Sequence, residues 1–413
     1  MKAFLILGIV LLAIDLYAFK GISLLINHYA SAWVLKILFW AVNILIYLQL
    51  YRLISNYRSL QVENPDVLRF WSGIIITIFI TKLGFIFFHL LDDLFWGGKK
   101  LANFTQSKIQ STNSNTISRG KFLTQIGAGA AALLLGSFTY GVTKGRYAFQ
   151  VMKEKIHFDN LPESFSGLKI VQISDLHLGS FVKDFEDVKV GIDLINAQNP
   201  DYIFFTGDMV NSHCAEAEPW IDLFASLEAK EGKYSVFGNH DYADYGPYSP
   251  TEKAESIARL KEIHREMGFK LLEDENLYIE KNGEKIALAG MHNWGKDFHR
   301  VGNINNTLQG LSEDDFTILL SHDPSLWEEE INNKRKVELT LSGHTHGMQM
   351  GVEIPFLNLK WSPVKYRYKR WAGLYEEAKN YIYVNRGFGF LGFPGRVGMK
   401  PEITVLELFT KKA

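Results

Sequence analysis

The sequence predicts an α/β fold in its C-terminal part, preceded by a helical region that crosses a membrane. From about residue 168 onward, short apolar segments rich in β-branched and aromatic residues alternate with helical patterns, as is typical of βαβ units. Four apolar stretches of about bilayer-spanning length occupy the first third of the chain. With 413 residues, the chain is long enough for two or three units and a sizeable core.

The apolar stretches are predicted transmembrane helices, which run over Ala3 to Phe19, Ala32 to Leu50, Phe70 to Leu91 and Gln125 to Val142. They lack the polar faces with helical periodicity that the alternative, a soluble helical bundle, requires. Four tryptophans suit an interfacial aromatic belt: Trp33, Trp40, Trp71 and Trp96. We expect a membrane region with three helices over 1–100, a polar linker over 101–124, a fourth apolar helix and possible signal-anchor over 125–145, and a separate domain over 146–413.

Two signals disagree on which side of the membrane the C-terminal region faces. If the N-terminus is inside, eight Lys and Arg residues lie in the cytoplasmic segments against six on the other side, which places residues 146–413 in the cytoplasm. The segment Ser118 to Leu123, followed by the small-residue run Gly127 to Ala132, resembles a twin-arginine export signal that lacks its second arginine. The expected location is a bacterial cytoplasmic membrane, with both orientations open.

Charge and cysteine content exclude some classes of protein. The formal net charge of -1 argues against a protein built around a broad nucleic-acid-binding face. Cys214 is the single cysteine, so no intramolecular disulfide can form. We therefore expect no nucleic-acid partner and no disulfide framework.

The C-terminal region reads as alternating strands and helices. The predicted strands are Leu168 to Ser174, Tyr202 to Thr206, Tyr234 to Phe237, Ile286 to Gly290, Phe316 to Ser321, Val337 to Ser342, Tyr381 to Asn385 and Ile403 to Leu408. A helical pattern spans Asp184 to Gln198. A second helix is expected over Pro250 to Met267, because Ser249 and Glu252 have capping-box spacing and Gly268 offers a stop.

Polar side chains follow five of the predicted strands at their C-terminal ends. In open α/β sheets this edge is where ligands bind. The groups expected to converge there are Asp175, His177, Asp208, Asn239, His240, His322, His344 and His346. Any one of these histidines alone is more often an ordinary loop or core residue, but their joint order, each after a predicted strand, indicates a site.

The chemistry of this set favours divalent metal ions. Imidazole, carboxylate and amide groups without thiolate suit Mn, Fe or Zn, and more ligands are present than one ion needs. Two ions that share a carboxylate can bind phosphate oxygens and polarise a bridging water into hydroxide. The residues therefore predict a two-metal hydrolase.

The motifs Asp175-x-His177, Gly207-Asp208, Gly238-Asn239-His240-Asp241, His322 and Gly343-His344-x-His346 resemble the signature of calcineurin-like metallophosphoesterases, over Leu168 to about Leu408. The resemblance implies a four-layer sandwich of two mixed β-sheets flanked by helices. It implies one metal on Asp175, His177, Asp208 and His346, and the other on Asp208, Asn239, His322 and His344. In that scheme His240 and Asp241 are catalytic: His240 protonates the leaving oxygen, and Asp241 supports it.

Within that superfamily, the chain is similar to bacterial membrane-linked phosphodiesterases on Gly343 to Gln349, Asn385 to Gly389 and Pro401 to Ile403. Some members of that branch cleave UDP-2,3-diacylglucosamine in lipid A biosynthesis. Asn211 stands where the protein Ser/Thr phosphatases carry a second acid, which argues against a phosphoprotein substrate. The resemblance implies a phosphodiesterase or pyrophosphatase, in which a metal-bridging hydroxide attacks a lipid-linked substrate.

Two segments bear on the substrate. Basic and aromatic residues alternate from Lys360 to Trp371, which suits a phosphate and a headgroup, a lipid surface, or simply a solvated loop. The glycine-interleaved residues Phe388, Phe390, Leu391 and Phe393 form a second apolar loop that could dip into lipid.

Three alternatives stay open. The protein could be a broad phosphomonoesterase, or an inactive membrane scaffold with a phosphoesterase-like binding domain. A transporter unit with an attached enzyme is the third, and its intramembrane polarity would rest on Asp15, Lys36, Lys82 and His89.

Overall fold

The computed structural model describes residues 2–103, 119–181, 184–354, 357, 359–377 and 379–411. The chain divides into two compact units, Met1–Tyr140 and Gly141–Ala413. Most of the predicted polar linker, over residues 104–118, lies outside the described residues, and so do Ser118 of the export-like segment and the side chain of Trp96.

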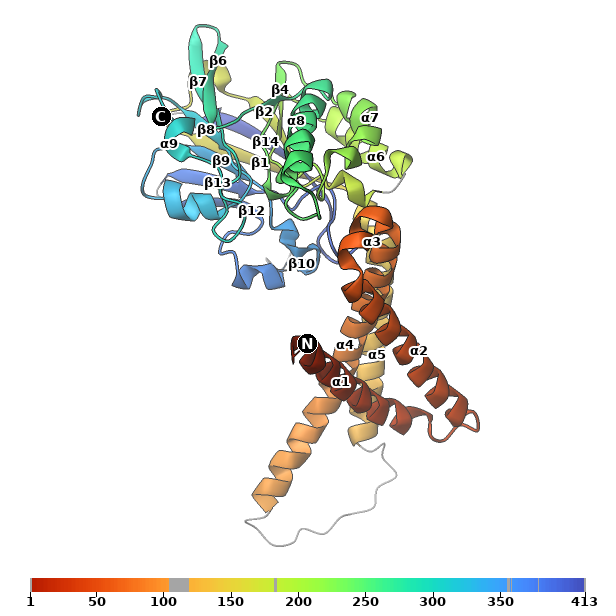
Figure 1. The fold of residues 1–413 in the computed structure, drawn as a ribbon. Helices are drawn as coiled ribbons and strands as arrows, with labels where there is room; N and C mark the ends of the chain where they lie inside the picture. The colour runs from red at the N-terminus through yellow and green to blue at the C-terminus, as the bar shows by residue number, and fades with distance from the viewer. Residues whose placement is uncertain are drawn as a thin grey trace. The chain divides into compact units, whose positions relative to one another are not determined.

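The first unit consists of long apolar helices: α1 (Lys2–Ile26), α2 (Ala32–Ser55), the short α3 (Tyr57–Glu63), α4 (Pro65–Asn103) and α5 (Arg119–Thr143), which continues into the second unit (Figure 1). Among the described residues, four of these helices are long and apolar enough to cross a membrane. Each of the four apolar stretches predicted from the sequence lies in one of them, which confirms the helices and indicates a membrane protein.

An ion pair lies among these apolar helices. Lys82 on α4 donates to Asp15 Oδ1 on α1 at 2.6 Å, and it also donates to Asn43 on α2. Tyr47 on α2 donates to the second oxygen of Asp15. Asp15 and Asn43 are each only 2% exposed. The cluster therefore ties three helices together, and it joins two of the four polar residues that stood out in the apolar stretches.

We expect Lys82→Met to destabilise the first unit more than the double variant Lys82→Met/Asp15→Leu. Removing one partner leaves a buried carboxylate without a counter-charge, at a cost of about 3–5 kcal/mol, whereas replacing both partners by apolar groups is often neutral. Thermal unfolding of the full chain in one detergent would measure the difference. A single variant as stable as the double would contradict a paired cluster.

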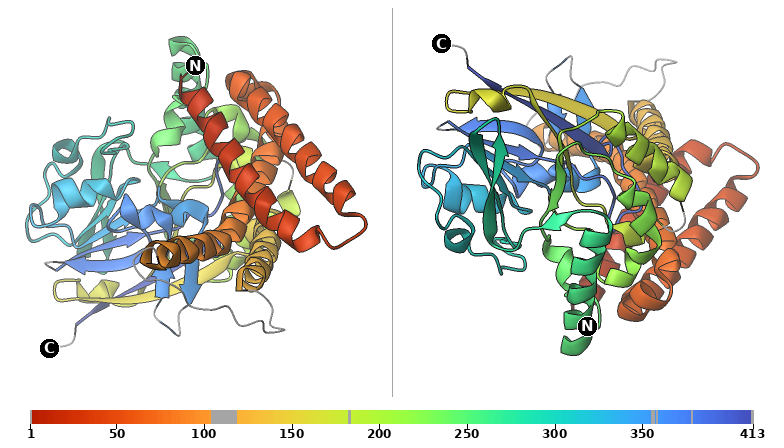
Figure 2. Two further views of the ribbon diagram at one scale, coloured as in Figure 1. Left: turned by 90° about the horizontal axis from the view of Figure 1, so that it is seen from below. Right: turned by 90° about the horizontal axis from the view of Figure 1, so that it is seen from above.

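The second unit is built around two six-stranded sheets (Figure 2). The first has the order β1 (Gln150–Phe158), β14 (Glu402–Thr410), β2 (Leu168–Ile173), β3 (Tyr202–Phe205), β4 (Gly232–Ser235) and β5 (Lys270–Leu271). The second has the order β12 (Gly373–Glu377), β13 (Asn380–Val384), β9 (Leu339–Ser342), β8 (Thr317–Leu320), β7 (Glu284–Gly290) and β6 (Glu275–Lys281). Strands β2 to β5 run parallel, as do β7, β8, β9 and β13.

The two sheets pack face to face and are covered on their outer sides by helices. Side chains of both sheets, such as Ile170, Phe204, Leu288 and Leu341, form one buried cluster between them. The outer face of the first sheet packs on α6 (Phe185–Asn196), α7 (Ile221–Ala225) and α8 (Pro250–Glu266). The outer face of the second packs on α9 (Ile304–Thr307) and the helical turn Trp327–Ile331. This confirms the four-layer α/β sandwich of two mixed sheets.

The two ends of α8 lie where the sequence predicted them. Ser249 Oγ accepts from the N–H of Glu252 at 3.3 Å, and Glu252 Oε2 accepts from the N–H of Ser249 at 2.7 Å. Gly268 then has a φ of 81° just beyond the helix, a conformation that costs glycine little. The predicted helix over Pro250 to Met267 is confirmed to within one residue.

The glycine-interleaved apolar loop corrects one expectation. Phe388 is fully buried, Phe390 is 1% exposed and Phe393 is 6% exposed, so they do not form a surface that dips into lipid. The ring of Phe388 packs against Phe149 with centroids 4.4 Å apart. A Cβ on Gly389 would stand 1.9 Å from the carbonyl oxygen of Leu176, so glycine here allows the loop to lie directly on the chain after β2. The alternation of glycine and phenylalanine therefore reflects a loop that packs closely inside the second unit.

Candidate metal centre

The site residues follow the C-terminal ends of neighbouring parallel strands. Asp175 and His177 follow β2, Asp208 follows β3, and Asn239 and His240 follow β4 of the first sheet. The second sheet supplies His322 after β8, and His344 and His346 after β9. Because the two sheets face each other, these five strand ends meet at one edge of the sandwich.

The backbone at this edge is unusual. Asp175, His177, Asp208, His344 and His346 all have positive φ values, between 46° and 71°. Non-glycine residues rarely take this left-handed conformation, which costs about 1–3 kcal/mol each and clusters at functional sites. Gly343 explains how the segments come so close, because a Cβ there would stand 2.4 Å from an oxygen of Asp175. The fold thus tolerates unfavourable backbone conformations at these residues, which direct their side chains toward one point.

Asp175, His177 and His346 form a first group of metal-ligating atoms, all within 4.8 Å of one another. His346 Nε2 lies 3.1 Å from Asp175 Oδ1 and 3.1 Å from His177 Nε2. All three residues are buried. Arg396 lies behind the group, where its Nη2 is 3.4 Å from Nδ1 of His346 and fixes the orientation of that ring.

Asp208, His322 and His344 form a second group, whose ligand atoms also lie within 4.8 Å of one another. His322 Nε2 lies 3.1 Å from Asp208 Oδ2, and His344 Nδ1 lies 3.3 Å from His322 Nε2. The opposite nitrogen of His322 is 2.7 Å from the carbonyl oxygen of Thr206, to which it must donate. In the neutral ring, Nε2 therefore presents its lone pair to the group.

One carboxylate oxygen serves both groups. Oδ2 of Asp208 is 3.1 Å from His322 Nε2 in the second group and 3.6 Å from His177 Nε2 in the first. The other oxygen, Oδ1, accepts from the backbone N–H of His240 at 2.8 Å, which holds the carboxylate in place. Asp208 thus occupies the position of a bridging ligand between the groups.

The donor set fits divalent cations. Two carboxylates and four imidazoles converge in the two groups, and lone pairs brought this close repel one another unless positive charge lies between them. Asn239 Oδ1 is a further oxygen that is buried without a hydrogen-bond partner among the described residues. An amide oxygen in that setting costs free energy unless a cation or donor satisfies it.

The electrostatics of the site agree with this chemistry. Burial lowers the pKa of two candidate ligands, His177 and His344, which favours their neutral, metal-binding form. Burial by itself raises the pKa of Asp208, but His322 and His240 outweigh it and hold the pKa well below its usual range. Burial lowers the pKa of His322, yet the Asp208 carboxylate outweighs burial and raises that pKa to about 10. The Asp208 carboxylate thus favours positive charge beside it, which a protonated His322 or a cation can supply.

His240 is held beside the two groups, and its ring orientation is fixed. Its Nδ1 lies 2.6 Å from the carbonyl oxygen of Asn211, to which it must donate, and this leaves Nε2 available. The ring stacks on Tyr245 with centroids 4.1 Å apart, and its centroid is 5.0 Å from that of His177. His240 is therefore placed next to the candidate ligands and has a nitrogen for proton exchange.

Asp241 lies at the backbone of the loop after β3. Its carboxylate accepts from the N–H groups of Asp208 and Gly238 through Oδ2, at 2.9 and 2.8 Å, and from that of Met209 through Oδ1 at 2.8 Å. This places it under the loop that carries Asp208, whereas the His240 ring bonds Asn211. The bonds of the Asp241 carboxylate described here are thus to the backbone of that loop and to Gly238.

Three further residues are neighbours of the site, and sequence reasoning did not single out two of them, Tyr245 and Phe298. Tyr245 stacks on His240 and accepts from Asn239 Nδ2 at 2.8 Å. Tyr368 OH lies 2.8 Å from His344 Nε2, and Phe298 packs edge-on against the His344 ring at 4.7 Å. Tyr368 lies in the basic and aromatic segment that the sequence did indicate.

We expect Tyr245→Leu to lower kcat by about 10- to 100-fold, the range seen when a residue that orients a metal-site group is lost. The substitution removes the stacking partner of His240 and the partner of the Asn239 amide. Tyr278→Leu serves as the matched control, because Tyr278 lies on the edge strand β6 and its hydroxyl donates to Asp315. Steady-state kinetics on one phosphodiester would compare them, and equal activity of both variants would contradict the positioning role.

The comparisons with known proteins agree with this geometry. Residues 168–348 match the family described as calcineurin-like phosphoesterase, and residues 1–146 match a family described as probable calcineurin-like phosphoesterase, transmembrane domain. The uncharacterized metallophosphoesterase YkuE of Bacillus subtilis (strain 168) is 34% identical over 300 residues, covering 71% of this chain and 98% of that protein.

Similarity extends to animals. A transmembrane protein with metallophosphoesterase domain from Danio rerio is 26% identical over 311 residues, covering 70% of this chain and 67% of that protein. Among solved structures, phosphopantetheinyl hydrolase from Mycobacterium tuberculosis aligns with a TM-score of 0.31 at 11% identity, covering 53% of this chain and 88% of that chain. That level of agreement carries no conclusion about substrate.

Proposed function

Because this chain belongs to the calcineurin-like metallophosphoesterases and carries an N-terminal transmembrane domain, we propose that it is a membrane-anchored phosphodiesterase or pyrophosphatase with two divalent ions, Mn, Fe or Zn. The observation that carries the proposal is the place of Asp208 Oδ2, within 3.6 Å of ligand atoms from both groups. One group alone would serve a single ion. A shared carboxylate oxygen is the feature that a pair of ions requires.

The ligands divide between two ions. Asp175, His177, Asp208 and His346 would hold one, and the described geometry gives three of them a common focus. The second would take Asp208, His322 and His344, together with the buried oxygen of Asn239. Ions held in this way supply Lewis-acid stabilisation of a phosphoryl group and an activated water.

The remaining residues act on the substrate and on its proton. His240, whose Nδ1–H donates to the Asn211 carbonyl, would act as the imidazolium: its Nε2–H would give a proton to the leaving oxygen and leave the ring neutral. Asp241 holds the loop that positions Asp208, through three of its backbone N–H groups. Tyr368 orients His344 from the opposite side.

The proposed substrate is a lipid-linked phosphodiester or pyrophosphate such as UDP-2,3-diacylglucosamine, at a bacterial cytoplasmic membrane. Two features support a lipid-borne substrate: the chain is anchored by four apolar helices, and the basic and aromatic segment contacts the site through Tyr368. Asn211, whose carbonyl oxygen accepts from His240 Nδ1, stands where the protein Ser/Thr phosphatases carry a second acid, which argues against a phosphoprotein substrate.

The experiment compares substrates in full-length protein purified in detergent with Mn²⁺. We expect bis-p-nitrophenyl phosphate to be cleaved with higher kcat/KM than p-nitrophenyl phosphate. We also expect UDP-2,3-diacylglucosamine to be cleaved, and to inhibit the hydrolysis of both by competing for the site. Preference for the monoester would favour the broad phosphomonoesterase. Bound metal without turnover of any phosphoester would favour the inactive scaffold.

A further inference from the structure

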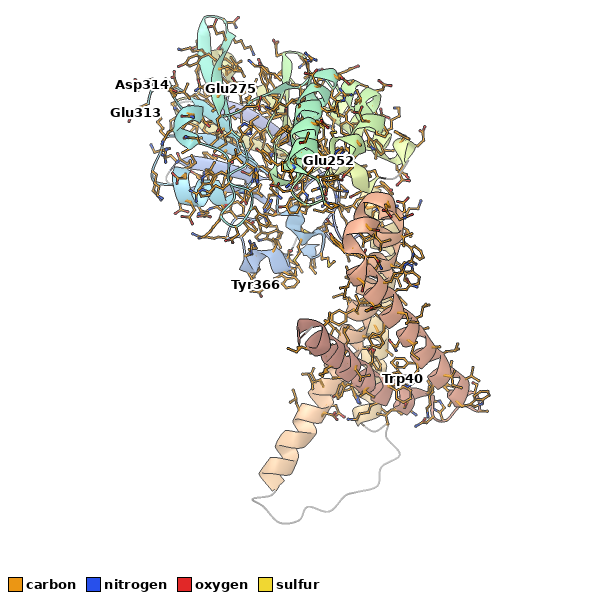
Figure 3. The ribbon with its side chains drawn as sticks, in the orientation of Figure 1. Trp40, Glu252, Glu275, Glu313, Asp314 and Tyr366 are labelled. Atoms are coloured by element: carbon orange, nitrogen blue, oxygen red, sulfur yellow. The ribbon has the colours of Figure 1, made fainter. Side chains whose placement is uncertain are left out.

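A small two-stranded ribbon stands outside both main sheets of the second unit. It pairs β10 (Val352–Ile354) with β11 (Leu359–Trp361) and continues into a short helical segment, Pro363–Tyr366. Exposed apolar side chains on the ribbon, on the turn before it and on the helical segment after it are here called the ribbon patch: Met348, Val352, Leu359, Trp361 and Tyr366. In Figure 3, Tyr366 lies at the periphery of the unit, well away from Glu275, Glu313 and Asp314.

Exposed apolar side chains are concentrated here. Among the described residues of Gly141–Ala413, ten large hydrophobic side chains are exposed, and six of them lie between residues 348 and 366. Tyr366 is 77% exposed, the highest fraction of the ten. Scattered apolar residues need no explanation on a protein surface, but exposed apolar side chains concentrated on one short segment are typical of an interaction site.

The ribbon patch is also basic. Between Met348 and Lys369 the sequence contains four basic residues, Lys360, Lys365, Arg367 and Lys369, and one acid, Glu353. Glu353 is paired with Arg386 at 2.8 Å and Arg367 with Asp297 at 3.0 Å, so Lys360, Lys365 and Lys369 supply the local excess of positive charge. In a chain with a net charge of only -1, a local excess of positive charge beside exposed aromatic rings is a distinct feature.

The ribbon patch rests on a rigid base that includes the metal-ligand loop. Beneath it, Val364, Trp371, Ala372 and Met399 form a separate buried cluster. Thr345, which stands between two candidate ligands, donates to the carbonyl of Trp371 at 2.7 Å. Trp371 is thus buried in the base while Trp361 of the same segment faces outward. A surface that engaged the ribbon patch would be held at a fixed distance from the site.

We propose that the ribbon patch docks on the surface of an anionic lipid bilayer. Exposed tryptophan and tyrosine with flanking lysines are the side chains that settle at the level of lipid headgroups, where the rings contact acyl chains and the cations attract anionic lipids. The chain carries four helices of membrane-spanning length, so a bilayer is always within its reach. The docking itself does not depend on the proposed function. Its consequence does: a site docked on the bilayer would meet phosphoesters carried by lipids.

The test uses full-length protein in nanodiscs that contain anionic lipid and a spin-labelled phosphatidylcholine quencher. Cys214 is the only cysteine, so a Cys214→Ala background accepts one environment-sensitive fluorophore at a chosen position. Tyr366→Cys places the fluorophore in the ribbon patch, and Glu313→Cys is the matched control elsewhere on the same unit. We expect quenching and a blue shift at position 366 and neither at position 313.

Charge reversal tests the electrostatic part of the proposal. Adding Lys365→Glu and Lys369→Glu to the Tyr366→Cys protein should remove most of the quenching, as should replacing anionic lipid by phosphatidylcholine alone. Equal fluorescence at positions 366 and 313 would overturn docking and would leave a protein partner as the occupant of the ribbon patch. Hydrolysis of bis-p-nitrophenyl phosphate by the labelled Tyr366→Cys protein in the same nanodiscs is a separate readout. If this protein shows quenching but no hydrolysis, the proposed function is refuted and docking stands.

Discussion

Asp208→Asn is expected to lose both metal ions and to lower kcat by on the order of 10³-fold or more. Its Oδ2 lies within reach of both candidate groups, so its charge is the one feature that both ions share. Losing several kcal/mol of Lewis-acid stabilisation corresponds to at least three powers of ten in rate. The amide keeps an oxygen for the His240 N–H that now bonds Oδ1, so the loop is expected to keep its shape.

Metal content by mass spectrometry and hydrolysis of bis-p-nitrophenyl phosphate would both be measured on the variant. The matched control is Asp193→Asn, because Asp193 is an exposed residue of α6 that pairs only with Lys189 in the described structure. We expect the control to keep both ions and full activity. If Asp208→Asn kept two ions per chain, the bridging role would be refuted.

His240→Asn is expected to keep both ions and to lose about 10²- to 10⁴-fold in kcat, the usual contribution of a general acid. His240 is outside both metal-ligating groups, and its ring is oriented by Asn211 and Tyr245. The loss should be greater for a diester with an alkyl leaving group than for one with p-nitrophenolate, because the better leaving group needs less help from a proton.

His157→Asn is the matched control, because His157 lies exposed on β1 and stacks only on Phe409 among the described rings. Metal content and kinetics on the two diesters would be measured in parallel. A loss that is the same for both leaving groups would contradict the general-acid role of His240, and a loss of metal would show that His240 is a ligand.

The sequence predicted the strands that lead into the site, and physical chemistry explains why. Buried parallel strands such as β3 and β8 are short apolar runs that end abruptly in polar residues, here Asp208 and His322. That boundary is visible without a structure. The convergence of those ends then follows from parallel strands sharing one edge of each sheet.

The strands at the sheet edges were not predicted. β1, β6 and β12 lie at edges and carry exposed charged residues such as Lys153, Glu280 and Glu376, which break the apolar pattern. Strand propensity is weak there, because only one face is buried. The sequence alone therefore predicted the interior of the sandwich better than its margins.

Residues that act through packing also escaped sequence reasoning. Tyr245 belongs to no motif, and its place on His240 depends on the left-handed turn at Ala243, where φ is 57°. Phe388 shows the reverse case, because an apolar run beside glycines gives no sign of whether it faces lipid or core. Only tertiary contacts, such as its approach to the Phe149 ring, decide that question.

The most direct test of the central claim is the metal content of the full-length protein, measured together with its phosphodiesterase activity before and after chelation. We predict two Mn²⁺ per chain, loss of bis-p-nitrophenyl phosphate hydrolysis when they are removed, and recovery of both when Mn²⁺ is returned. Hydrolysis that persists without metal, or full activity with a single ion, would contradict a two-metal site built around Asp208.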